Sequence, residues 1–318
     1  MKNDITQPNI DLVYLWVDGS DPKWQAKRSI FIDGNTGKIS ESNCKGRYAN
    51  NDELKYSLRS AEKYAPWIRK IFIVTDDQTP DWLDITNPKI NIIDHKEIMP
   101  EKSLPCFNSR VIEYFIHRIP DLSEHFLYAN DDMFFNAYIT PDFFFESDGF
   151  PIVRLKRKVF GKLHYWSKFL TGKKPSSYKT TVYKASILVE KKCGKYYAGV
   201  PHHNINAYKK TDCYEIFENV FWEQTKKSLT HRSRTYEDLS PSIILYYTSA
   251  IGHGHLKYVD RQESKRISAH KADFMEQLLR YQPKLLCLND SQRVKDEDRE
   301  RIMPFLEKLF PKKSAFEK

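Results

Sequence analysis

The sequence predicts an α/β protein with a mostly parallel sheet, flanking helices and a more helical C-terminal part. Short apolar runs with the composition of strands alternate with helical segments as far as residue 150, and this alternation is typical of parallel sheets. Three of the apolar runs end at an aspartate, namely Asp18, Asp76 and Asp131. Ligands bind at the carboxyl ends of parallel strands, so these aspartates indicate a binding site at one edge of the sheet.

The expected strands of the first half are rich in β-branched and aromatic residues. They cover residues 10–17, 70–76, 90–95 and 126–130. A helix is expected over residues 51–67, where Asn51 or Asp52 can cap the first turn. A second helix is expected after Asn108, because apolar residues recur at helical spacing between residues 111 and 119.

The second half is expected to add helices and one further apolar run. The helices cover residues 212–227, 239–251 and 292–309, and the apolar run covers 284–290. We place a boundary near residue 150, which divides a core of residues 1–150 from a basic part of residues 151–318. The alternative is a single domain in which the second part elaborates the first.

The composition favours anionic partners. The chain has 318 residues, a formal net charge of +9 and a pI near 9.0. Much of the excess lies in the stretch 154–174 and in Lys312, Lys313 and Lys318. No nucleic-acid-binding motif is present, so an anionic membrane surface or a phosphate-bearing substrate is expected rather than nucleic acid.

The N-terminal segment is polar, and no apolar run approaches the roughly 18 residues that a transmembrane helix needs. The 5 cysteines are widely scattered without a C-x-x-C pair, which favours reduced thiols. We therefore expect a cytoplasmic protein with peripheral contact at the inner face of the membrane. The glycine-rich phosphate loops G-x-x-x-x-G-K-[ST] and G-x-G-x-x-G are absent, so a nucleotide site would depend on a metal and basic side chains.

The stretch FLYANDDMFF places Asp131 and Asp132 between apolar residues. Burying two adjacent carboxylates costs several kcal/mol each, roughly, unless a cation or hydrogen-bond donors compensate. Such a pair at a strand end is suited to Mg²⁺ or Mn²⁺ against a diphosphate. The same residues are also compatible with a turn of solvated aspartates.

Two further segments offer chemistry. His202 and His203 are adjacent, and neighbouring side chains of an extended segment point to opposite faces, so one can face a cleft while the other packs. A histidine there is suited to remove a proton from a sugar hydroxyl, although structural histidines are more common. Arg234 lies in the stretch HRSR and offers donors for phosphate, or else belongs to a solvated helix cap.

The sequence resembles the Stealth family of hexose-1-phosphate transferases over most of its length. The first conserved block of the family is similar to IDLVYLWVDGSDPKW. The second block is similar to RYANNDELKYSLRSAEKYAPWIRKIFIVTDDQTPDWL, continuing through LPCFNSRVIEYFIHRIPDLSEHFLYANDDMFF. VPHHNINAYKK through HRSRTYEDLSPSIILYY resembles a diverged third block, and LLCLNDSQ with FLEKLFPKKSAFE the fourth.

The resemblance implies a Rossmann-like core of the GT-A glycosyltransferase kind and a role in capsule or exopolysaccharide synthesis. It implies a nucleotide-sugar donor, commonly a UDP-hexosamine, a divalent metal, Mg²⁺ or Mn²⁺, and a saccharide or lipid-linked saccharide acceptor. Residues 1–150 would then bind the donor and the metal, and residues 151–318 would form the acceptor side.

Matching positions carry the family's functional residues onto this chain. Asp131 and Asp132 match the acidic pair that would hold the metal, His202 the third-block histidine proposed as base, and Arg234 the basic residue after it. The positions that would shape the donor pocket are Asp18, Asp21, Arg47, Asn51, Asp52 and Arg59.

Two departures stand out. The second block usually has a histidine where this chain has Arg110, and the third usually has a proline soon after its histidine, where Asn204 follows here; His203 is therefore an alternative to His202.

The expected reaction leaves a sugar 1-phosphate on the acceptor and releases a nucleoside monophosphate. One alternative is a metal-dependent glycosyltransferase that releases a nucleoside diphosphate. The other is a non-catalytic basic module that binds anionic polysaccharide.

Overall fold

A five-stranded sheet forms the centre of the computed structural model, which describes residues 8–32, 45–158, 161–162 and 176–318. Its order is β3-β2-β1-β4-β8, and its strands are β1 (Ile10–Leu15), β2 (Ile71–Thr75), β3 (Ile90–Asp94), β4 (His125–Asn130) and β8 (Asn206–Lys209). β1 to β4 are parallel and β8 is antiparallel to β4. The predicted α/β class with a mostly parallel sheet is confirmed.

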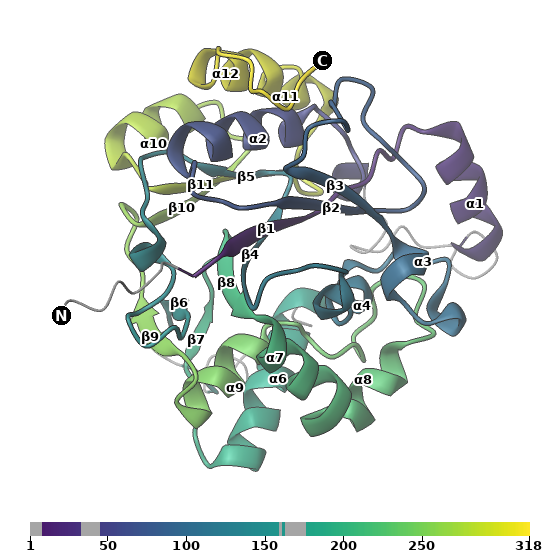
Figure 1. Cartoon of the computed structure of the whole chain (residues 1–318), viewed down its shortest axis with the longest axis vertical. Coiled ribbons are helices and arrows are strands. Elements are labelled where there is room, and N and C mark those ends of the chain that lie inside the picture. The colour runs from purple at the N-terminus through teal and green to yellow at the C-terminus, as the bar shows by residue number, and fades with distance from the viewer. Residues whose placement is uncertain (1–7, 33–44, 159–160, 163–175) are drawn as a thin grey trace.

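Helices cover both faces of this sheet, which explains why every residue of β1 and β2 is buried. In Figure 1, α2 (Glu53–Tyr64), α10 (Phe274–Tyr281) and α12 (Ile302–Leu309) lie above the sheet. The helices below it are α4 (Ser109–Glu113), α6 (Ser177–Cys193), α7 (Lys210–Tyr214), α8 (Trp222–Ser228) and α9 (Ile243–Ile251). α1 (Pro22–Ile32) and α3 (His95–Ile98) lie at the right of the same view.

Two smaller sheets extend the core. One has the order β10-β11-β5 and consists of β10 (Ser264–Ser268), β11 (Leu285–Asn289) and β5 (Met133–Phe135). The other has the order β7-β6-β9 and consists of β7 (Gly199–Pro201), β6 (Ile152–Arg157) and β9 (His255–Tyr258). β5 follows β4 almost directly in the chain, so it links the main sheet to the first of these.

Several expected helices are shorter than the sequence pattern indicates. The helix expected over 292–309 is two helices, α11 (Asp296–Arg299) and α12, and Pro304 lies in the first turn of α12, where proline is tolerated. The segment 212–227 contains α7, a π-helical turn over Glu215–Val220 and α8. The helix expected after Asn108 ends at Glu113 and is followed by a single 3₁₀ turn, Ile116–Arg118.

The two parts of the chain share their sheets. β8 pairs with β4, β11 pairs with β5, and the Arg59 guanidinium binds both carboxylate oxygens of Glu317 at 2.8 Å. The boundary expected near residue 150 stays a prediction. Among the described residues, every helix is either too short or too polar to span a lipid bilayer. Most of the basic stretch 154–174 lies outside the described residues.

Candidate functional site

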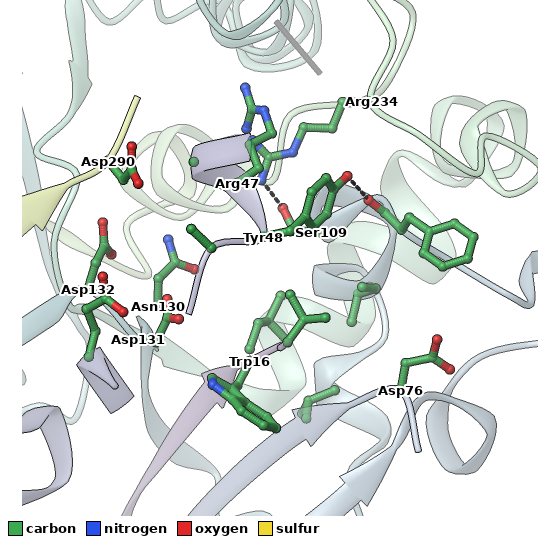
Figure 2. A pocket seen from close by; sticks show the side chains of 18 of the residues that line it. Trp16, Arg47, Tyr48, Asp76, Ser109, Asn130, Asp131, Asp132, Arg234 and Asp290 are labelled. Atoms are coloured by element: carbon green, nitrogen blue, oxygen red, sulfur yellow. Dashed lines mark hydrogen bonds between the residues drawn. The ribbon is translucent and has the colours of Figure 1, made fainter. Parts of the chain in front are cut away.

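A cavity of about 210 Å³ opens at the carboxyl edge of the parallel strands. Leu15 of β1 pairs with Val74 of β2 and with Asn130 of β4. The residues that follow these positions therefore emerge at the same edge, and Trp16 and Asp131 line the cavity. Figure 2 shows this cavity with its labelled side chains.

Carboxylates gather on one side of the cavity. Asp131, Asp132, Glu53 and Asp290 all line it, and Asp131, Asp132 and Asp290 lie on the left in Figure 2. Burial, followed by the charge of Glu53, raises the pKa of Asp132 to about 7 and that of Asp131 well above its usual range. The Oδ1 atom of Asp132 is buried without a hydrogen-bond partner. Close, desolvated carboxylates and an unpartnered oxygen fit a divalent cation, because hard cations take oxygen ligands.

Asp290 is brought to the cavity by a close approach of two loops. Its carboxylate pairs with Arg299 at 2.7 Å. A Cβ atom added to Gly46 would lie 2.3 Å from the Asp290 Oδ1 atom, so only glycine fits there. Gly46 precedes Arg47, and both residues line the cavity together with Asp290.

Arg47 and Arg234 supply the positive charge of the site. Both line the cavity and lie above and to the right of Asp131 in Figure 2. The Arg234 Nη2 atom donates a hydrogen bond to the Ser109 hydroxyl. Guanidinium groups bind phosphate oxygens through paired donors, so this side of the cavity is suited to a phosphoryl group.

The loop that carries Arg234 is fixed by Asp238, which is buried. Its carboxylate accepts hydrogen bonds from the Thr235 amide at 2.8 Å and from the Asn108 side chain at 3.0 Å, and contacts Arg110 at 3.2 Å. Arg110 also donates to the Thr235 carbonyl at 2.8 Å. Arg110 thus supports the Arg234 loop and does not line the cavity.

The two adjacent histidines have different surroundings. His202 is fully buried, and its ring nitrogens bond to Ser264 at 2.9 Å and Asn206 at 3.2 Å. His203 lines the cavity. It adopts a left-handed backbone conformation with φ 58, which turns its side chain away from that of His202. The structure places His203, and not His202, beside the carboxylates of the cavity, and the role of either histidine as the base stays a prediction.

A second cavity, of about 710 Å³, meets the first at His203, which lines both. Its lining includes the tyrosines Tyr178, Tyr183, Tyr196, Tyr197 and Tyr246 and the cations Lys156, Arg157, Lys158, Lys179 and Arg266. No carboxylate is found among the described residues that line it. Aromatic faces with polar donors are suited to a saccharide, and the cations favour one that carries negative charge.

Asp76 marks the other end of the first cavity, to the right of Trp16 in Figure 2. Its Oδ1 atom accepts a hydrogen bond from Lys27 at 2.9 Å, and its Oδ2 atom is buried without a partner. His95 also lines this end, and burial lowers its pKa to about 4. Trp16 and Trp24 provide aromatic surface beside these polar groups. This end can therefore take a planar ring with hydrogen-bonding edges.

The expected donor-pocket residues are divided between the cavity and its supports. Arg47 lines the cavity, whereas Asp18 and Asp21 are joined through Gln78, at 2.9 Å to each, and hold the loop before α1. Asp21 also accepts a hydrogen bond from the Lys23 amide at 2.8 Å, which caps α1.

Asn51, Asp52 and Arg59 are likewise outside the cavity lining. Asn51 donates to Glu53 from its backbone and its side chain, both at 2.7 Å, so it positions a cavity carboxylate. Asp52 pairs with Lys55 at 2.9 Å. Arg59 is buried against Glu317 and the Phe310 carbonyl. The Arg59 guanidinium ties α2 to the end of the chain, and any role of Arg59 in shaping the donor pocket stays a prediction.

Sequence reasoning missed two carboxylates of the cavity and gave a third no role. Glu53 looked like an ordinary acidic residue in the first turn of a helix, and Asp290 like the end of a separate apolar run. Asp76 was placed at the binding edge of the sheet as a strand-end aspartate but was given no role there. All three lie at or next to the carboxyl end of a strand or the start of a helix, which is the signal that could have found them.

The fold and the cavity define an α/β protein with a candidate site for phosphate and a divalent cation at the strand ends. Three regions match Stealth protein family models: conserved region 1 at residues 8–36, conserved region 2 at 47–153 and conserved region 4 at 276–318. The capsular polysaccharide phosphotransferase cps12A of Actinobacillus pleuropneumoniae is 33% identical over 91% of this chain and 78% of its own length. The chain belongs to the Stealth family, as its sequence indicates. The segment expected to match the third block lies between these regions and stays a prediction.

Other relatives are longer than this chain. The exopolysaccharide phosphotransferase cps2G of Lactiplantibacillus plantarum is 50% identical over 45% of this chain and 41% of its own length. The capsular polysaccharide phosphotransferase SacB of Neisseria meningitidis serogroup A is 32% identical over 98% of this chain, which spans 57% of SacB. Among solved structures, the galactosyltransferase LgtC matches 96% of each chain with 10% identity and a TM-score of 0.45. That likeness is too low to support an argument about function.

Proposed function

We propose that this protein transfers a sugar 1-phosphate from a nucleotide-sugar to a saccharide hydroxyl in capsule or exopolysaccharide synthesis. Family membership and the names of the relatives support the reaction class. The observation that carries the proposal is that His203 lies where two cavities meet. One cavity combines carboxylates with arginines, and the other combines tyrosines with cations, so a donor and an acceptor can approach the same imidazole.

The donor would lie along the first cavity. Its nucleoside would occupy the end formed by Trp16, Asp76 and His95, and its diphosphate the end that faces Arg47 and Arg234. We take the nucleotide-sugar to be a UDP-hexosamine, as the family resemblance implies. Preorganised guanidinium groups stabilise the charge that develops on a transferring phosphoryl group, and this is the role we assign to both arginines.

His203 would act as the general base in place of His202. Burial and the surrounding cations lower the pKa of His203 to about 3, so its ring is neutral at neutral pH and can accept a proton. The negative charge of a bound donor offsets those cations and strengthens the base. As a ring nitrogen takes the hydroxyl proton, the acceptor oxygen bonds to the β-phosphorus. The bond from that phosphorus to the bridging oxygen breaks, and the nucleoside monophosphate leaves.

Asp131 and Asp132 would hold Mg²⁺ or Mn²⁺, with Glu53 and Asp290 close by. A divalent cation bound there would neutralise the donor diphosphate and the leaving monophosphate. The unpartnered Asp132 Oδ1 atom and the raised pKa values of the pair support this assignment.

The acceptor saccharide, free or lipid-linked, would lie in the second cavity against its tyrosine faces. The basic side chains that line this cavity are also suited to a peripheral contact with an anionic membrane at the cytoplasmic face. Salt-reversible flotation with anionic liposomes would detect this contact. Recovery of the protein in the unbound fraction at low salt would refute that contact.

The decisive experiment identifies the nucleotide that is released. Purified protein would be incubated with UDP-sugars and other nucleotide-sugars, a capsular oligosaccharide acceptor, and either Mg²⁺ or EDTA. Metal-dependent release of a nucleoside monophosphate, with a new phosphodiester in the product, is expected. Release of a nucleoside diphosphate would instead identify a glycosyltransferase. Salt-sensitive polysaccharide binding without turnover, unaffected by EDTA, would identify a binding module.

A further inference from the structure

Three side chains next to the carboxylate cluster form a group whose donor atoms do not match a hard cation. One ligand atom each of Asp132, His203 and Cys287 lies within 4.8 Å of the other two. The Cys287 Sγ atom is 3.5 Å from the Asp132 Oδ2 atom. Mg²⁺ prefers oxygen ligands to sulfur ligands, whereas thiolate and imidazole together favour Zn²⁺ and similar ions.

The backbone holds two of the three residues in fixed register. Cys287 lies in the middle of β11 and pairs with Met133 of β5, and the Leu288 amide donates to the Asp132 carbonyl at 2.9 Å. The Cys287 side chain is fully buried, so it cannot turn away from Asp132 toward solvent. His203 reaches the same point from the segment after β7, in its left-handed conformation.

The Asp132 carboxylate offers an oxygen atom that no protein group satisfies. Its Oδ2 atom faces the thiol, and its Oδ1 atom is buried without a hydrogen-bond partner. Buried polar atoms are normally paired. The nearby carboxylates of Asp131 and Glu53 add negative charge around the same point, which attracts a cation whatever its softness.

We propose that Asp132, His203 and Cys287 bind a soft divalent cation of the Zn²⁺ class, and that this cation blocks transfer while it is bound. Three protein ligands with sulfur, nitrogen and oxygen donors leave a fourth position of a tetrahedral ion for water. Binding replaces the thiol proton, which goes to solvent, with a metal–sulfur bond. Inhibition rests on the proposed function, because the ion would occupy Asp132 and the ring of His203; binding does not depend on it.

The binding test needs neither donor nor acceptor. Metal-free protein would be titrated with Co²⁺, whose bond to a thiolate produces an intense near-ultraviolet absorption band, and then with Zn²⁺ as competitor. Wild-type protein is expected to show the band and to lose it when Zn²⁺ is added. Cys287→Ser is expected to lack it. Cys213→Ser is the matched control, because Cys213 is also buried but lies in α7 and does not belong to the group of three ligand atoms.

A second variant guards against misfolding of Cys287→Ser. His203→Gln keeps the thiol but removes a ligand. Because loss of an outer-shell partner alone weakens metal affinity by about 10-fold, His203→Gln is expected to weaken Co²⁺ binding by at least this factor. A band that persists in Cys287→Ser, no band in wild type at saturating Co²⁺, or unchanged affinity in His203→Gln would each overturn the site.

Inhibition is measured separately. With Mg²⁺ present, Zn²⁺ is expected to inhibit wild type at a concentration about 10-fold or more below that needed for Cys287→Ser, each relative to its own zinc-free rate. Equal sensitivity would refute the inhibitory role. Failure of the Co²⁺ test would leave Mg²⁺-dependent transfer intact, and failure to detect transfer would leave the Co²⁺ result intact, so the two proposals fail separately.

Discussion

His202 and His203 are neighbours in the chain, yet their imidazole rings have different partners and different solvent access. The His202 ring bonds to Ser264 and Asn206 inside the protein, whereas the His203 ring lies at the junction of two cavities. The left-handed backbone at His203 separates the two directions. Non-glycine residues in this conformation are uncommon and are found at functional sites.

Alanine substitution should separate the two histidines. His203→Ala is expected to lower kcat by about 10²–10⁴, the usual contribution of a general base, with little change in thermal stability. His202→Ala leaves the buried Ser264 hydroxyl without its partner and is expected to lower the free energy of unfolding by about 1–3 kcal/mol. Initial rates and thermal melts of both variants test this, and a larger kcat loss in His202→Ala would contradict the assignment.

The carboxylate cluster makes the stability of the metal-free protein depend on pH. Burial raises the pKa of Asp132 from 3.8 to about 7, so between these values the folded protein binds more protons than the unfolded chain. The free energy of unfolding should therefore fall as pH rises from about 4 to 7, because the carboxylates become ionised while they remain desolvated. Asp132→Asn should reduce that slope and stabilise the metal-free protein near pH 8.

Urea unfolding in EDTA at several pH values measures this effect. Asp142→Asn, which alters an exposed aspartate, is the control and should keep the wild-type slope. Mg²⁺ should restore stability in wild type at pH 8 more than in Asp132→Asn. The same slope in wild type and Asp132→Asn would show that Asp132 does not carry the effect.

Arg59 should affect stability and leave donor binding unchanged. Its ion pair with Glu317 is buried, with the two side chains 6% and 4% exposed, and breaking such a pair costs about 3–5 kcal/mol. Arg59→Ala is expected to lower the unfolding free energy by that amount, while the donor KM of the folded fraction stays at the wild-type value. Lys226→Ala removes an exposed pair, 42% and 66% exposed, and should cost about 1 kcal/mol or less. A raised donor KM in Arg59→Ala would show that Arg59 does contribute to the donor site.

Arg234 should affect the rate of the chemical step. Loss of one preorganised donor at a developing charge costs about 10²–10³ in kcat, and Arg234→Ala is expected to lose this much. Ser109→Ala removes only the hydroxyl that the Arg234 guanidinium contacts, so its loss should be smaller and in the same direction. Single-turnover rates measure both variants, and a change in donor KM alone would assign Arg234 to ground-state binding.

The central strands could be predicted because each is a continuous apolar run bounded by turn residues. β5 to β10 were missed because they have only 3 to 6 residues each, and all but β5 and β7 include polar or charged residues. Pairing partners, rather than local composition, define such strands. α6 was missed for a similar reason, because its buried positions include serine and threonine.

The residues of the site divide in the same way, into those that the local sequence predicts and those that only tertiary contacts define. Asp131, Asp132, Arg47 and Arg234 line one cavity, as the strand ends and the family resemblance indicated. Alternation indicated that one of two histidines faces a cavity but not which one, because that depends on the left-handed turn. Arg59 could not be placed from the sequence, since its partner Glu317 is 258 positions away.

The meeting of two cavities at a single imidazole has a consequence for inhibitor design. A compound that joins a nucleoside to a short saccharide through a neutral linker past His203 would occupy both cavities with one molecule. The second half then binds as an intramolecular event, so affinity can exceed that of either half by about 10²–10⁴ when the linker spans the gap. A series of such compounds with different linker lengths would measure the distance between the two binding positions in solution, because the compound that binds most tightly has the linker that matches this distance.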